Sequence, residues 1–129
     1  MALLYAELTS KILEACFEVS NELGAGFLES VYEKSLLIAL RQKGLRARSQ
    51  VPIAVTFRNE NVGEFYADIL VEDKIIVELK AVTALAPQHK AQVINYLKAT
   101  GLEVGLLVNF GPPKIEFNRL HKPQLDQPA

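Results

Sequence analysis

The sequence predicts an α/β fold in which helices flank a mixed β-sheet, and three observations support this. Residues 47–57 and 64–80 are rich in Val, Ile and Leu and are divided by polar turns, which is typical of an antiparallel meander. Residues 87–100 begin with a proline and are followed by Gly101, as helices commonly are. The largely apolar run "EVGLLVNF" (103–110) is typical of a buried parallel strand. The predicted order is therefore α-α-β-β-β-α-β-β.

Two helices are expected before the sheet. The first, over residues 3–22, is predicted by apolar side chains at the spacing of one helical face, namely Leu8, Ile12, Ala15 and Val19. The glycines of "LGAG" (23–26) favour its end, because glycine tolerates the left-handed conformation of a helix terminus. A second helix is expected over residues 27–42, before Gly44.

The remaining elements are predicted from turns and prolines. Pro52 favours an edge position for the strand 47–57, because proline cannot donate to a sheet ladder. The polar "RNENVG" (58–63) predicts the turn into the strand that carries Asp68, and "KIEFNRL" (114–120) could add a last edge strand. We expect one domain over residues 1–120 and a flexible C-terminal tail over residues 121–129.

Composition excludes several classes of protein. The 129 residues are 50% hydrophobic and 22% charged, which is typical of a folded globular chain. No apolar run approaches the roughly 20 residues that cross a bilayer, so no membrane partner is expected. Cys16 is the single cysteine, which excludes an internal disulfide and favours a reducing, cytoplasmic setting. The net charge of −1 argues against general electrostatic binding of nucleic acid.

One stretch is locally basic. In "RQKGLRARSQ" (41–50) four cations occur without an acid among them, namely Arg41, Lys43, Arg46 and Arg48. The stretch is either an ordinary solvated surface or a small patch that contacts phosphate. The second interpretation makes Arg46 and Arg48 candidate substrate-binding residues.

The most informative stretch is "ADILVEDKIIVELKA" (67–81), which predicts a hairpin with charged residues away from its turn. If the turn comprises the three residues 72–74, Asp68 lies directly opposite Glu78 and shares its face of the sheet. Lys80 then projects from the same face, about 6–7 Å further along. A two-residue turn would place the two carboxylates on opposite faces.

Two interpretations of this cluster are open. Two adjacent buried carboxylates repel each other, and burying them is costly unless a positive charge compensates. Lys80 alone could offset one charge in an ordinary ion pair with nothing bound. Alternatively Asp68 and Glu78 bind a divalent cation, because Asp and Glu oxygens are ligands that Mg²⁺ and Mn²⁺ prefer.

Four motifs in order resemble a known family. Asp68 followed by "ELK" (78–80) resembles the PD-(D/E)XK nuclease superfamily, whose fold is the restriction-endonuclease-like core. "QVINY" (92–96) is similar to the Gln-x-x-x-Tyr motif of the exonuclease-like branch, and "GFLESVY" (26–32) spells Gly-x-x-Glu-x-x-Tyr. Together they resemble the GxxExxY protein family over about residues 8–119. The superfamily's proline is replaced by Ala67, at a position that varies within the superfamily.

The resemblance implies roles for individual residues. Asp68, Glu78 and the backbone carbonyl of Leu79 would hold Mg²⁺ or Mn²⁺, which polarises the phosphate and activates water. Lys80 would position that water or stabilise negative charge, a role we prefer over general base because the neighbouring acids favour the charged amine. Glu29 would complete the metal shell directly or through water, or is a first-turn glutamate favoured by the helix dipole.

The helix 87–100 supplies further candidates. Gln92 is expected to face the site as a catalytic residue, with Tyr96 on the same helical face as a substrate-binding residue. Without the family, Tyr96 would be interpreted as a buried tyrosine with a satisfied hydroxyl. His89 could contact the phosphate, although a single histidine at a helix start is more often structural.

The resemblance implies an enzyme, a Mg²⁺-dependent nuclease that hydrolyses phosphodiester bonds, with DNA as the expected substrate. The alternative is a non-catalytic module that binds a protein or nucleic acid with the same fold. We expect a core this small to need a homodimer or a protein partner to hold its substrate. The sequence does not distinguish a DNA substrate from an RNA substrate, or exonucleolytic from endonucleolytic cleavage, and it does not identify a biological pathway.

Overall fold

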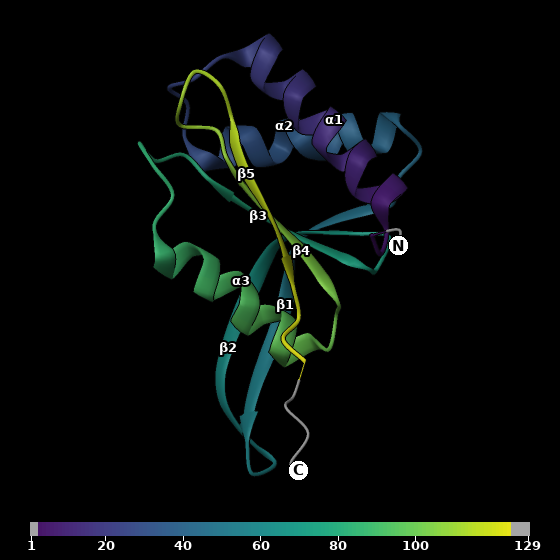
Figure 1. Ribbon diagram of the computed structural model, residues 1–129, viewed down its shortest axis with the longest axis vertical. Helices are drawn as coiled ribbons and strands as arrows, with labels where there is room; N and C mark the ends of the chain where they lie inside the picture. The colour runs from purple at the N-terminus through teal and green to yellow at the C-terminus, as the bar shows by residue number, and fades with distance from the viewer. Residues whose placement is uncertain (1–2, 125–129) are drawn as a thin grey trace.

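The structure is a computed structural model, and it describes residues 3–124. A five-stranded sheet in the order β1-β2-β3-β4-β5 forms its centre, with helices on both faces (Figure 1). This confirms the predicted fold and element order. The elements are α1 (Ala6–Leu23), α2 (Glu29–Gln42), β1 (Ala47–Phe57), β2 (Glu60–Val71), β3 (Ile75–Lys80), α3 (Pro87–Thr100), β4 (Val104–Asn109) and β5 (Glu116–His121).

The pairing of the strands follows from the connections between them. β1, β2 and β3 form an antiparallel meander, α3 carries the chain across to β4, which pairs parallel to β3, and β5 returns antiparallel. β1 is an edge strand, as Pro52 predicts. The turn between β1 and β2 is shorter than predicted. It comprises only Arg58 and Asn59, both of which have positive φ, as the central residues of a tight hairpin turn do.

The hydrophobic core has two parts, one on each face of the sheet. Alternate residues of β3, namely Ile75, Val77 and Leu79, pack in the cluster that includes α1 and α2. Ile76 faces the other way, into the cluster that includes α3. Because side chains alternate along a strand, the remaining even positions of β3 also belong to the α3 side. Glu78 and Lys80 occupy those positions.

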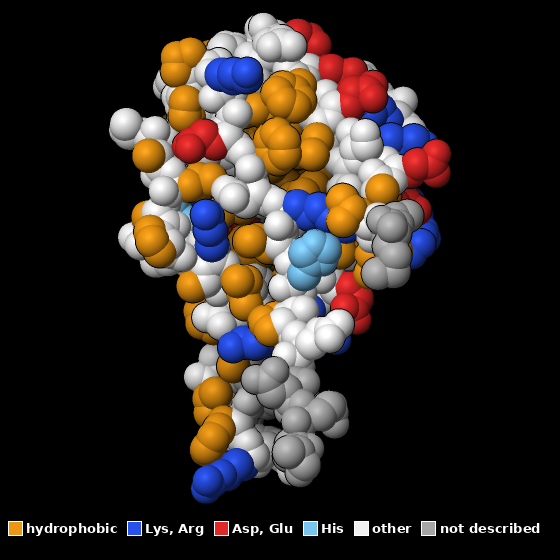
Figure 2. Space-filling model, viewed as in Figure 1, with side chains coloured by type: hydrophobic (Ala, Val, Ile, Leu, Met, Phe, Trp, Pro, Cys, Tyr) orange, Lys and Arg blue, Asp and Glu red, His pale blue; other side chains and the backbone are white. Residues whose placement is uncertain are grey.

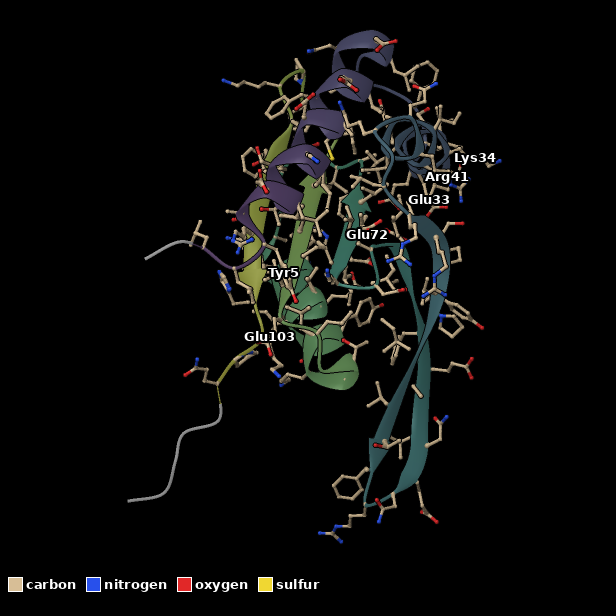
Figure 3. All side chains as sticks on the ribbon, turned by 90° about the vertical axis from the view of Figure 1, so that its right-hand side faces the viewer. Tyr5, Glu33, Lys34, Arg41, Glu72 and Glu103 are labelled. Carbon is tan, nitrogen blue, oxygen red and sulfur yellow. The ribbon has the colours of Figure 1, made fainter. Side chains whose placement is uncertain are left out.

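The β1–β2 hairpin extends beyond the rest of the sheet. β1 pairs with β2 along its whole length, whereas β3 pairs with β2 only at residues 69–71. The distal half of the hairpin therefore has no third strand beside it, and it projects from the molecule (Figures 1 and 3). The face shown in Figure 2 narrows towards this end, and basic side chains are dispersed over it.

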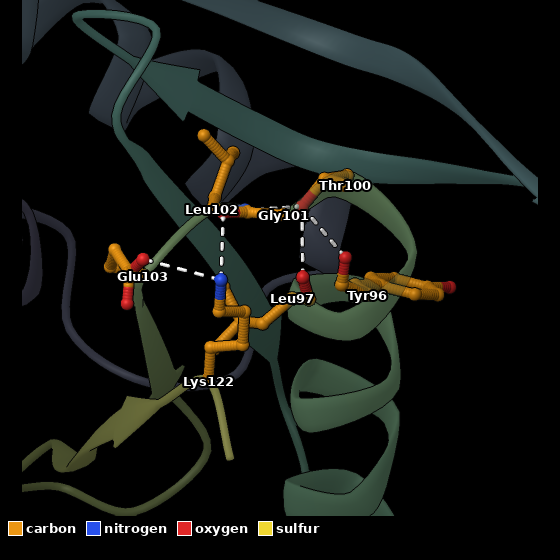
Figure 4. Close-up of polar contacts among 7 residues, drawn as sticks. All are labelled: Tyr96, Leu97, Thr100, Gly101, Leu102, Glu103 and Lys122. Atoms are coloured by element: carbon orange, nitrogen blue, oxygen red, sulfur yellow. Dashed lines mark hydrogen bonds and ion pairs between the residues drawn. The ribbon is translucent and has the colours of Figure 1, made fainter. Parts of the chain in front are cut away.

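The end of the described chain is tied to the loop before β4. Lys122 donates its backbone N–H to the Glu103 carbonyl at 2.8 Å, and its ammonium lies 3.2 Å from the Glu103 carboxylate (Figure 4). The expected flexible tail begins at residue 121, but β5 includes His121. Residues 125–129 of that tail lie outside the described part of the chain. Within residues 3–124, no helix is both long and apolar enough to span a bilayer.

A glycine lets α3 approach the sheet closely. A Cβ atom added at Gly105 in β4 would lie 2.7 Å from Cγ1 of Val93, a fully buried residue of α3. Real Cβ contacts are not this short, so the larger side chain would push α3 outwards. The spacing between α3 and the sheet therefore depends on this pair.

We expect Gly105→Ala to lower the free energy of unfolding by about 1–3 kcal/mol, because it overpacks the core. Val93→Ala alone should also destabilise, because it leaves a cavity. The double variant, Gly105→Ala with Val93→Ala, should lose less free energy of unfolding than the sum of the two single losses. Val93→Ala removes the methyl groups with which the new Cβ atom would clash. Urea unfolding of the three variants measures this coupling, and strictly additive losses would contradict the close contact.

Candidate active site

Asp68 and Glu78 meet at the point where β2 and β3 separate. The pairs from Val71↔Ile75 to Ile69↔Val77 confirm the predicted three-residue turn, and the same register places the two acids opposite each other. Beyond the Ile69↔Val77 pair, hydrogen bonds from backbone N–H groups to side-chain carboxylates replace the backbone–backbone hydrogen bonds between β2 and β3. Glu78 Oε1 accepts a hydrogen bond from the Asp68 N–H at 2.8 Å, and Asp68 Oδ2 accepts one from the Leu79 N–H at 2.8 Å. Each carboxylate thus bonds the backbone of the opposite strand.

β1 is distorted at the same level. Gln50 lies opposite Asp68, but the two residues do not pair in the register, and Gln50 has φ of 52°. Ala67 and Leu70 both pack in the cluster beneath α3, although regular alternation would place residues three apart on opposite faces. The chain therefore changes face beside Asp68. Local irregularities of this kind re-aim a side chain, and non-glycine residues at positive φ often mark functional sites.

Burial determines the charge of Glu78. Only 3% of the residue is exposed, and burial, followed by the nearby Asp68 carboxylate, raises the pKa of Glu78 to about 8. The hydrogen bond from the Asp68 N–H and the charge of Lys80 act in the opposite direction but are smaller. Without a cation, most Glu78 side chains therefore carry a proton at neutral pH.

Lys80, Gln92 and Tyr96 form a chain of hydrogen bonds between β3 and α3. Lys80 Nζ donates to Gln92 Oε1 at 3.2 Å, and Gln92 Nε2 donates to the Tyr96 hydroxyl oxygen at 3.2 Å. Burial, and after it the nearby Glu78, raises the pKa of Tyr96, so its phenol keeps its proton. Both ends of the Gln92 amide are engaged, and the amide therefore fixes the direction of the lysine.

The donor atoms at the strand separation fit a hard divalent cation. The Leu79 N–H points towards β2, and the carbonyl of a strand residue points to the same edge as its N–H. The Leu79 carbonyl therefore faces the same gap as the two carboxylates, each of which has a second oxygen. Within residues 3–124, no three Asp, Glu, His or Cys side chains converge as metal ligands. Two carboxylates and a carbonyl suit Mg²⁺, which commonly keeps several waters and substrate oxygens in its shell.

The structure does not bring Glu29 into the carboxylate pair. Glu29 is exposed at the start of α2, so its predicted role in the metal shell stays a prediction. One turn later along α2 lies half-buried Glu33, which is labelled in Figure 3. It accepts a hydrogen bond from Gln50 Nε2 at 2.8 Å. Burial raises the pKa of Glu33, the Gln50 bond opposes this, and the charges of Asp68 and Glu29 add to the rise.

Glu33 and Gln50 were not predicted to lie at the site. The signal for Glu33 was its position four residues after Glu29, on the same face of the helix. Gln50 gave no comparable signal, because its positive φ is not visible in the sequence.

Three predicted substrate-binding residues bond to neighbouring groups instead of the carboxylate pair. His89 Nδ1 accepts the Ala86 N–H at 2.9 Å and so caps the start of α3. Arg46 Nε lies 3.5 Å from Glu72, and Arg48 Nη2 lies 2.8 Å from Asp73, both in the β2–β3 turn. The other two cations of the basic stretch also have partners, the Ala47 carbonyl for Arg41 and the carboxylates of Glu14 and Glu18 for Lys43. These contacts favour the solvated-surface interpretation of residues 41–50.

The raised pKa of Glu78 predicts how the metal-free protein responds to pH. Its folded pKa of about 8 exceeds the ordinary glutamate pKa of 4.5, so the folded state binds more protons between these values. Stability from this group is present below pH 4.5 and is lost as pH rises through 8. We expect the free energy of unfolding to fall by roughly 2–4 kcal/mol between pH 5 and 8.

Urea unfolding in EDTA at several pH values measures this trend. Glu78→Gln should flatten it, because an amide does not ionise, whereas Glu60→Gln, at an exposed carboxylate at the start of β2, should not. An equally steep decline in the Glu78→Gln protein would contradict the assignment to Glu78.

Comparisons with known proteins identify the family and the fold. The family model described as the PD-(D/E)XK nuclease superfamily matches residues 6–120. The chain is similar to a solved structure described as "Crystal structure of SSO0001", with 22% sequence identity and a TM-score of 0.59. The similarity covers 95% of this chain but 61% of that chain, and it shows a shared fold. A comparison with curated proteins gave no match. Because the family match spans most of the sequence, the chain belongs to the PD-(D/E)XK nuclease superfamily.

Proposed function

We propose that this chain is a divalent-cation-dependent nuclease that hydrolyses phosphodiester bonds, with DNA as its substrate. The observation that carries the proposal is the convergence of Asp68 and Glu78 beside Lys80, in a member of this superfamily. The narrower membership of the GxxExxY family and a single catalytic domain over residues 1–120 are parts of the same proposal. We place the activity in the cytoplasm, where the buried thiol of Cys16 would stay reduced.

Asp68, Glu78 and the Leu79 carbonyl would hold Mg²⁺ or Mn²⁺. Such a cation, when bound, polarises the phosphate and lowers the pKa of water. The protein prepares for the cation by holding two acids together against their repulsion. In the metal-free state a proton on Glu78 relieves part of that repulsion. Binding therefore releases this proton, and metal affinity should increase with pH.

The remaining side chains of the site stabilise negative charge on the phosphate and orient the group that does so. The ammonium of Lys80 places a positive charge beside the acids, where it can offset the negative charge that develops on the phosphate. Gln92 holds that ammonium in place, and Tyr96 in turn holds the Gln92 amide. The hydroxyl hydrogen of Tyr96 remains available to donate to a substrate oxygen. Gln92 is in this scheme a positioning residue.

One observation favours the alternative of a non-catalytic binding module. The four cations of residues 41–48 already contact protein groups, and the net charge is −1. Such a surface attracts a polyanion weakly. In the catalytic proposal, a homodimer or a protein partner would supply the additional contacts that hold the nucleic acid. In the alternative the fold binds a protein or nucleic acid and the acids bind no cation.

Metal binding separates these two functions. At Mg²⁺ or Mn²⁺ concentrations of ten to a hundred times the dissociation constant, we expect stabilisation by about 1–3 kcal/mol. Glu78→Gln and Asp68→Asn should abolish the rise in melting temperature, whereas Glu60→Gln should keep it. If neither cation changes the melting temperature of the parent protein, the result favours the non-catalytic module.

Activity is tested by cleavage of labelled linear and circular DNA in Mg²⁺. Lys80→Ala should lower kcat about 100- to 1,000-fold, because it removes the charge that stabilises the transition state. It should keep the metal-induced rise in melting temperature, because Lys80 does not hold the cation. Lys34→Ala, at an exposed lysine of α2, is the matched control and should cleave normally. Equal cleavage by Lys80→Ala and the parent would exclude this role.

The role of Gln92 is tested by comparing substitutions. Gln92→Ala should lower kcat about 10- to 100-fold, because a misplaced charged group loses much of its effect. Gln92→Glu keeps an acceptor for Lys80 and should retain more activity than Gln92→Ala. Both should keep the metal-induced rise in melting temperature. If KM alone changes and kcat does not, Gln92 binds substrate and does not position Lys80.

A further inference from the structure

A groove runs between α3 and the distal half of the β1–β2 hairpin. Its volume is about 680 Å³, and its walls are residues 54–56 and Phe65 of the hairpin and the side of α3 that faces the hairpin. The groove exists because the hairpin extends past β3, so no third strand fills the space beneath the helix. It is open to solvent and within the range of volumes that hold small ligands.

The groove adjoins the candidate active site. Gln92 and Tyr96 line it, and these two residues form the hydrogen-bond chain that ends at Lys80. A phosphate beside Lys80 would therefore have the groove next to it. A group that is covalently attached to that phosphate could enter the groove without leaving the active site.

The aromatic wall offers a surface for stacking. Phe65 is 45% exposed, and its ring centroid lies 5.9 Å from that of Tyr96, with the ring planes tilted by 40°. Gly63 leaves room for the phenylalanine, because a Cβ added there would lie 3.1 Å from the Phe65 ring. An exposed ring in a recess is costly in water, and it gains free energy when a flat apolar group covers it.

The polar wall is neutral apart from one cation. α3 contributes the side-chain amides of Gln88 and Asn95, and each amide presents both donors and an acceptor. Lys98 is the charged residue of the lining, which contains no Asp or Glu. In a chain of net charge −1, an acid-free groove with a lysine suits a ligand that is flat, rich in hydrogen-bonding edges and attached to phosphates.

We propose that this groove binds an unpaired nucleobase next to the scissile phosphate, so that the substrate is single-stranded DNA or a single-stranded end. This inference rests on the proposed nuclease function and specifies its substrate. Bases in a duplex are covered on both faces by their neighbours, so only an unpaired base can stack on Phe65 within the recess. The amides of Gln88 and Asn95 then meet the exposed edge of that base.

Binding is measured by fluorescence anisotropy in EDTA at fixed salt. The probes are a labelled 12-nucleotide single strand, a blunt duplex of the same sequence, and an abasic strand of the same length. We expect the single strand to bind more tightly than the other two. Phe65→Ala should weaken that binding at least about fivefold, because it removes the stacking surface, and Phe65→Trp should preserve it.

The matched control is Phe57→Ala, on the same hairpin, which removes a phenylalanine that is 59% exposed and lies outside the groove. It should bind the single strand like the parent. Melting temperatures of all variants identify any loss of folding. If Phe65→Ala binds like the parent, or the abasic strand binds like the normal strand, the proposal for the groove is overturned.

Cleavage in Mg²⁺ distinguishes this failure from failure of the nuclease proposal. If the parent cleaves duplex DNA and Phe65→Ala does so equally, the nuclease stands and the groove is not its base site. If the single strand binds through Phe65 but no substrate is cleaved with Mg²⁺ or Mn²⁺, the nuclease proposal fails while the groove remains a binding site. Phe65-dependent cleavage of single strands supports both.

Discussion

The constraint on which the rest of the structure depends is the pairing of two carboxylates at one position of the sheet. Asp68 and Glu78 repel each other, and the burial of Glu78, with Asp68 half-buried beside it, removes water that would reduce the repulsion. The fold offsets this cost with two backbone N–H groups, because each acid accepts a hydrogen bond from the opposite strand. The end of the β2–β3 backbone ladder and the position of the two acids therefore depend on each other. Ordinary strand pairing at residue 68 would remove the donors and leave the acids without compensation.

The remaining elements bring uncharged and positive groups to this pair. α3 can lie close to β4 because Gly105 has no side chain, and this closeness brings Gln92 within hydrogen-bond distance of Lys80. Next to this site, the hairpin continues past β3 and leaves a groove between itself and α3. The same residues of α3, Gln92 and Tyr96, thus orient the lysine and line the groove. Movement of α3 would change both at once.

The sequence predicted much of this arrangement, and what it did not predict has physical reasons. The three-residue turn at residues 72–74 fixed the register, because strand periodicity leaves only two faces. The four-residue spacing of Gln92 and Tyr96 placed both on one helical face. The distortion at Gln50 could not be predicted, because a glutamine at positive φ is held by its surroundings and not by its own preference. The ion pair of Arg48 with Asp73 also depends on a β1–β2 register that the β1 sequence does not specify.

The charge distribution suggests how a chain of this kind engages a polyanion. Each phosphate contact by a lysine releases counterions, so an interface with few cations gains little from the phosphate backbone and depends little on salt. Lys80 at the site and Lys98 in the groove are the cations placed to meet such a strand. In the proposed function, most of the affinity would then come from stacking on Phe65, from the amides of α3, and from a divalent cation held by Asp68 and Glu78. These terms favour a strand whose bases are free, and they act only after the strand has entered the groove. Binding and recognition of a single strand would therefore be the same event.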